Sequence, residues 1–138
     1  MKRITVVALL ALTYFAGNLR ASAQENAVQA TIPFDFTVGH QLLPSGEYRV
    51  AAVAPNVVSI SNAAKHVTVL SLMMNGDKPT GSSGRLVFNH YGNQYFLSKI
   101  ISPVAAKTLD LPISKLEKQA QWEQGKLHVN DQTTIALK

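Results

Sequence analysis

The side chains best suited to chemistry in this chain are four histidines, His40, His66, His90 and His128. Histidine can serve as a general base or a metal ligand near neutral pH. We expect these four on one loop and three different strands, and no two have the local spacing of a zinc-ligand pair. The sequence therefore predicts ordinary surface or half-buried histidines, with no metal site and no cofactor.

His90 is the most interesting of the four because it is predicted to face the core opposite Tyr95. A buried imidazole needs a partner, so structural pairing with Tyr95 or with backbone is the leading interpretation. The catalytic alternative is a hydrolase that uses His90 with Asp35 or with a loop serine. Strand alternation, however, sends Asp35 to the solvent side.

Local catalytic motifs are missing from the sequence. Cysteine is absent, and neither a Gly-x-Ser-x-Gly elbow nor a phosphate-binding glycine loop occurs. Ser82 and Ser83 lie between Gly81 and Gly84, where a flexible-loop composition explains them. We assign no catalytic residue and expect a protein that is not an enzyme.

The N-terminal segment has the pattern of a secretory signal peptide. Lys2 and Arg3 precede an apolar run over 4–16, and Ala21-Ser22-Ala23 offers a cleavage site. The run is shorter than the roughly 20 residues of a membrane-spanning helix. We therefore predict that residues 1–23 are removed and that the mature protein, exported to the periplasm or beyond the cell, begins at Gln24.

The mature chain would hold one domain over residues 24–138. Removing residues 1–23 from the 138 leaves 115, enough for one modest core. Because three of the 13 basic residues belong to the leader, the formal charge falls from +5 to +2. The remaining lysines and arginines are scattered, which disfavours nucleic acid or a membrane surface as partners. No disulfide can brace the fold.

Alternating apolar residues with Gly, Pro, Asn and Ser between them predict an all-β fold. We expect a sandwich or small barrel of about seven or eight strands. An outer-membrane barrel would need strands of roughly 9 to 11 residues, and most runs here are shorter. The first strand is predicted over 28–38, at a sheet edge or with a bulge because Pro33 lacks an amide. Its inward side chains are Val28, Ala30, Ile32, Phe34, Phe36 and Val38.

Two further predictions follow along the chain. After a turn over 43–46, a second strand over 47–53 should turn Tyr48, Val50 and Ala52 inward. A hairpin with residues 62–65 as its loop should pair Ile60 with Val67, Val58 with Val69, and Ser61 with His66 on the wet face. Met73 and Met74 would end the fourth strand, and Asn75–Gly84 would be a mobile exposed loop.

A third hairpin is predicted around Gly92-Asn93, with His90 opposite Tyr95, Phe88 opposite Leu97 and Leu86 opposite Lys99. Ser114 and Glu117 form a capping-box pattern for a helix to about Gln124. The helix would dock through Ile113, Leu116 and Ala120. Trp122 lies off that stripe, where it would cap the core or contact a partner. Residues 126–129 and 133–137 would form a terminal hairpin, with Leu127 opposite Ile135.

Four stretches of this chain resemble an uncharacterised family of small secreted proteins that is common in acidobacteria. These stretches are Val28–Gly39, Leu43–Tyr48, Leu86–Leu97 and Leu111–Lys118. They cover turn and core motifs across most of the mature chain. The resemblance implies export and one compact fold, and it brings no catalytic residues.

The leading functional hypothesis is a non-catalytic binding or interaction protein, whose first strand could recruit an extended partner by strand addition. The alternative is a periplasmic carrier of a small apolar ligand inside a barrel lined by Phe34, Phe36, Tyr48, Phe88 and Leu97. The candidate ligand- or partner-binding residues are Phe34, Phe36, Tyr48, His90, Tyr95 and Trp122.

Overall fold

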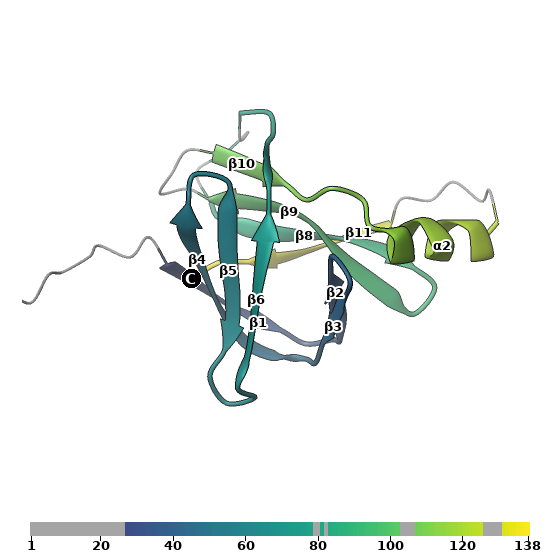
Figure 1. Ribbon diagram of the computed structural model, residues 1–138, viewed down its shortest axis with the longest axis horizontal. Helices are drawn as coiled ribbons and strands as arrows, with labels where there is room; N and C mark the ends of the chain where they lie inside the picture. Colours follow the sequence, from purple (N-terminus) through teal and green to yellow (C-terminus); the bar gives the residue numbers. More distant parts are fainter. Residues whose placement is uncertain (1–26, 79–80, 82, 103–106, 126–130) are drawn as a thin grey trace, which may run out of the picture.

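A computed structural model describes residues 27–78, 81, 83–102, 107–125 and 131–138. Two β-sheets face each other and one short helix projects from the second sheet (Figure 1), which confirms the predicted all-β class. The predicted leader and Gln24 lie outside the described residues, as do Ser82, His128 and the 126–129 half of the predicted terminal hairpin.

The first sheet has four antiparallel strands in the order β1-β4-β5-β6. These are β1 (Ala27–Ile32), β4 (Gly46–Ala54), β5 (Val57–Asn62) and β6 (Val67–Leu72). The predicted turn before β4 narrows to Pro44 and Ser45. Of the predicted inward residues of β4, Tyr48 and Val50 are buried, but Ala52 is exposed because a bulge disturbs the strand there.

The second sheet has the order β11-β8-β9-β10-β7, and a small hairpin extends it. Its strands are β11 (Asp131–Ala136), β8 (Arg85–Tyr91), β9 (Gln94–Ser102), β10 (Lys107–Asp110), β7 (Met74–Asn75), β2 (Phe36–Val38) and β3 (Gln41–Leu43). Thr37 of β2 pairs in parallel with Phe96 of β9. The described residues thus form eleven strands, more than the seven or eight predicted, because several are short and the chain changes sheet three times.

The first change of sheet divides the strand predicted over 28–38. β1 ends at Ile32 in the first sheet, and β2 begins at Phe36 in the second. Pro33 cannot donate a backbone hydrogen bond, and the Asp35 Oδ1 accepts one from the Ser45 amide at 2.7 Å, which fixes the corner. The prediction of one continuous strand is wrong, although its prediction of an edge position for β1 is confirmed.

The second change of sheet, at Pro44 and Ser45, returns the chain from β3 to β4 of the first sheet. The third occurs at Met73. β6 ends at Leu72, and the buried Met73 donates its amide to the Asn56 carbonyl at 2.8 Å. Met74 and Asn75 then pair with β10, so they do not end the fourth strand as predicted. Consequently Asn75 belongs to β7, and the Gly76 amide donates to the Thr108 carbonyl. The first two residues of the loop predicted over 75–84 are therefore held by backbone pairing.

The hairpin between β5 and β6 differs from its predicted register by two residues. Ile60 faces Val69, and the buried Asn62 faces Val67. Asn62 uses its side-chain Oδ1 to accept from the Lys65 amide at 3.0 Å, which moves the loop to 63–66 and places His66 in the turn at φ 53°. A shift of two keeps every side chain on its predicted face, since strand side chains alternate with period two.

The hairpin between β8 and β9 confirms part of its predicted register. His90 faces Tyr95, Phe88 faces Leu97, and Gly92 has the positive φ of 59° that its turn requires. A bulge beyond Phe88 then places Leu86 opposite Ile100, so the predicted Leu86–Lys99 pair is wrong.

Three fully buried aromatic rings join the two sheets at the centre of the core. Phe36 of β2 meets Tyr48 of β4 edge to face at 5.1 Å and Phe88 of β8 at 5.4 Å. The Tyr48 hydroxyl donates to the Pro44 carbonyl at 2.6 Å, which satisfies the polar atom of this buried ring.

The two lateral seams between the sheets differ. At one seam, Gln29 of β1 and Lys138 exchange two backbone hydrogen bonds, at 3.2 and 2.8 Å, and connect the first sheet to the end of β11. At the other seam, β6 pairs only with β5, and β3 pairs only with β2, among the strands that the structure describes. The structure is therefore a half-barrel that is closed on one side and open on the other (Figure 1).

Removing the Tyr48 hydroxyl should destabilise the fold. We expect Tyr48→Phe to lower the free energy of unfolding by about 1–2 kcal/mol, because the half-buried Pro44 carbonyl loses a short hydrogen bond. Urea denaturation measures this loss. Tyr95→Phe is the matched control, since Tyr95 contributes ring stacking; an equal loss in both variants would contradict the role of the Pro44 bond.

Candidate binding groove

A groove of about 860 Å³ occupies the open seam. Its walls are the C-terminal part of β6 (Val69–Leu72), the β2–β3 turn region (Val38–Leu42), and the segment Pro112–Lys115 that leads into helix α2 (Lys115–Glu123). Two of these walls are strand edges without a second neighbour. The groove therefore lies where a further strand could fit between β6 and β3.

Large aliphatic side chains on all three walls of this groove are exposed. Their exposed fractions are 68% for Leu42, 66% for Leu70, 70% for Leu72 and 52% for Ile113. Scattered apolar residues are normal on a protein surface, but several around one groove indicate an interaction site.

The sequence of β6 explains why its edge is open to pairing. Val67, Val69 and Ser71 alternate with Thr68, Leu70 and Leu72, whose side chains are exposed. Natural edge strands are usually protected by charged residues, proline or bulges. β6 has no charged residue, proline or glycine, and its pairing with β5 is regular over all its residues. This edge is suited to accept a further strand.

Helix α2 fixes the third wall of the groove. The Ser114 hydroxyl accepts from the Glu117 amide at 3.1 Å, which confirms the predicted N-cap. The Glu117 carboxylate is buried and accepts from Asn89 of β8 at 2.7 Å. The helix thus docks through Glu117 and Ala120, and the predicted docking through Ile113 and Leu116 is wrong, because both of these side chains are exposed.

The Tyr91 hydroxyl belongs to the same polar contact between α2 and the sheet. It accepts from Gln121 at 2.7 Å and lies 3.5 Å from Glu117 Oε1. Burial raises the pKa of Tyr91 above its ordinary value of 10.0; the Gln121 hydrogen bond opposes this, and the Glu117 charge adds to it. The neutral phenol therefore stabilises the fold below pH 10, and this contribution is lost as the pH rises through the folded-state pKa.

The residues predicted to bind a ligand lie away from the groove. Phe36 and Tyr48 are core residues. Phe34, Tyr95 and His90 are brought together, since Tyr95 stacks on Phe34 at 4.0 Å and on His90 at 4.4 Å. The partner of the His90 ring is thus the Tyr95 ring, through stacking.

Trp122 is 83% exposed on α2, so the predicted role as a cap on the core is wrong. A contact with a partner remains open for this side chain. The helix turns its Glu117 and Ala120 side toward the sheet, and Trp122 lies on the opposite side, because residues two or five apart fall on different faces of a helix.

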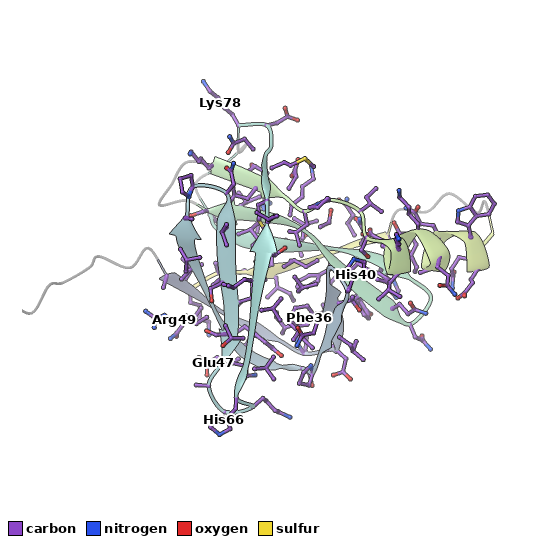
Figure 2. The ribbon with its side chains drawn as sticks, viewed as in Figure 1. Phe36, His40, Glu47, Arg49, His66 and Lys78 are labelled. Atoms are coloured by element: carbon purple, nitrogen blue, oxygen red, sulfur yellow. The ribbon has the colours of Figure 1, made fainter. Side chains whose placement is uncertain are left out.

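The three described histidines lie in separate places. His40 lies between β6 and the start of α2, and His66 lies in the turn at the far end of β6 (Figure 2). His90 lies in the ring stack. Within the described ranges, no three His, Asp or Glu side chains are grouped to hold a metal ion. Asp35, the predicted partner of His90 in a hydrolase, binds the Ser45 amide.

No single sequence motif identifies this groove. Leu42, Leu70, Leu72 and Ile113 look like ordinary strand or turn residues in the sequence. The one available signal was the uncharged composition of 67–72, which is unusual for an edge. It could be used only once the position of β6 in the sheet was known.

Comparisons with known proteins returned no relative: no family model, curated protein or solved structure matches this chain. In the part of the chain that the structure describes, no helix has the length and apolar character needed to cross a membrane.

Replacing Asn89 should loosen the third wall of the groove. In Asn89→Ala the buried Glu117 carboxylate loses its 2.7 Å donor, which should cost about 1–3 kcal/mol and speed amide exchange throughout α2. Hydrogen–deuterium exchange measures this. Gln132→Ala is the control, since Gln132 only donates to Asn89 from the surface at 3.3 Å; unchanged α2 exchange in Asn89→Ala would disprove the docking role.

The pKa of Tyr91 should respond to Glu117. We expect Glu117→Gln to lower the pKa of Tyr91 toward 10.0, because a nearby negative charge is removed. The ring carbon that bears the hydroxyl reports the titration by NMR. Tyr48 serves as the internal control, since its raised pKa comes from burial first, with Asp35 as the neighbouring charge. An equal change at both tyrosines would indicate general loosening instead.

Proposed function

We propose that this protein is an exported, non-catalytic binding module that takes an extended segment of a partner protein along the free edge of β6. The observation that carries the proposal is the open seam, where an uncharged, unpaired strand edge borders an apolar groove. Strand addition at such an edge is a common mode of peptide recognition, in which backbone hydrogen bonds supply affinity and alternate side-chain pockets supply specificity.

An added strand would use both sides of the groove. Its backbone would pair with β6, and its side chains would point alternately toward Val69 and Ser71 or outward beside Leu70 and Leu72. β3 would lie opposite, with Leu42 and Gln41 in contact with the segment. The inserted strand would then close the half-barrel on its open side.

The edge of β1 is less suited to this role than the sequence alone indicates. The amide and carbonyl of Gln29 are already paired with Lys138 of the same chain. A partner strand at β1 would first have to displace that pairing. β6 has no comparable competitor among the described residues, so the binding edge is assigned to β6.

The two alternative functions have less support. A carrier of an apolar ligand needs internal space, but Phe36, Tyr48 and Phe88 pack ring against ring where that ligand would lie. A hydrolase needs His90 near an acid or a nucleophile, but His90 stacks on Tyr95 and Asp35 caps the Ser45 amide. The packing of these residues therefore supports neither the carrier nor the hydrolase over a binding module.

The groove should select linear peptides that depend on the β6 edge. Random linear peptides displayed on phage are selected on the protein, and the selected peptides are titrated by fluorescence anisotropy. We expect Ser71→Lys to weaken their binding at least tenfold, because an inward charge on an edge strand blocks pairing. The β6 amides should also become protected from exchange on binding.

Val28→Lys on β1 is the matched control, since Val28 also faces inward, is half-buried like Ser71 and lies on the other edge of the same sheet. Circular dichroism first verifies that both variants fold. If Val28→Lys, and not Ser71→Lys, abolishes binding, the site lies on β1. Failure to select any peptide that is sensitive to Ser71→Lys would refute the proposal.

A further inference from the structure

We infer that the partner segment is acidic as well as aliphatic, with its carboxylate at the end of the groove beside α2. This inference rests on the proposed function and specifies which segment the groove favours. Two features of the groove carry it: the sign of the formal charge that lines it and the position of that charge at one end.

Among the residues that the structure describes, the ionisable ones that line the groove are His40 and Lys115, with no aspartate or glutamate. Both side chains are exposed. His40 belongs to the β2–β3 turn and lies near the start of α2 (Figure 2), where Lys115 is the first helical residue. The one formal positive charge of this lining, on Lys115, is therefore at the end beside α2, and the other described lining residues are apolar or formally neutral.

The nearest acidic side chain along the helix is directed away from this end of the groove. Glu117 is buried against the sheet, where its carboxylate accepts from Asn89. Among the described residues, Lys115 forms no ion pair with its own chain. An incoming carboxylate could therefore pair with Lys115 without displacing an internal partner.

The apolar part of the groove determines which side chains the rest of the bound segment should carry. Exposed Leu42, Leu70, Leu72 and Ile113 favour aliphatic side chains at alternate positions of an extended strand. A basic segment of the same shape would place a like charge beside Lys115, which disfavours it. Apolar contacts would supply most of the affinity, and the charged end would set the choice among partners and the direction of binding.

The same selection of random linear peptides tests this inference. We expect the selected peptides to carry alternating aliphatic residues and a net negative charge. For each one, a synthetic version with its acidic residues replaced by glutamine should bind about three- to tenfold more weakly at low salt, the range of one or two exposed ion pairs. Lys115→Gln should produce a loss of similar size with the original peptide and little further loss with the glutamine version.

Lys118→Gln is the matched control, because Lys118 is an exposed lysine of the same helix that does not line the groove. If the selected peptides are neutral or basic, or if Lys115→Gln and Lys118→Gln weaken binding equally, the acidic preference is refuted. Sensitivity to Ser71→Lys would in that case still support strand addition at β6. Peptides insensitive to Ser71→Lys would refute both proposals together.

Discussion

The need to pair the backbone at the edges of two sheets shapes this protein more than any single side chain. A sandwich of two sheets has two lateral seams, and each exposes backbone amides and carbonyls unless something covers it. Here Gln29 and Lys138 pair across one seam, and the residues that the structure describes supply no strand for the other. The open seam is therefore a consequence of where the chain changes sheet.

Two of the three changes of sheet also place the walls of the groove. The corner at Pro33–Asp35 sends Phe36 into the second sheet, so the β2–β3 hairpin stands across from the first sheet. The crossing at Met73 leaves β6 as an edge. The ring contacts of Phe36 with Tyr48 and Phe88 then hold both sheets at a fixed separation. The two opposing edges are thereby positioned before any partner arrives, which would lower the entropic cost of the proposed binding of an extended segment.

Alternation of apolar residues predicted which faces are buried better than it predicted which strands pair. Ala30, Ile32, Phe36 and Val38 are all buried as expected, although the strand that carries them divides between two sheets. The β5–β6 register differs by two residues for the same reason, because a period of two cannot distinguish registers that differ by two. The side-chain bond of Asn62 and the bulge in β9 decide the register, and neither has a periodic signal.

The candidate site was harder to predict than the fold. It consists of ordinary residues on a strand edge that has no neighbour among the described strands, and the sequence does not show which strands are neighbours. Aromatic and histidine side chains attract attention in a sequence, but here Phe36 and Tyr48 fill the core, and His90 completes a ring stack. Leu70 and Leu72 gain significance only because none of the described strands covers the edge that carries them. An uncharged edge of this kind also carries a risk of self-association, because none of the usual protections of an edge strand is present in β6.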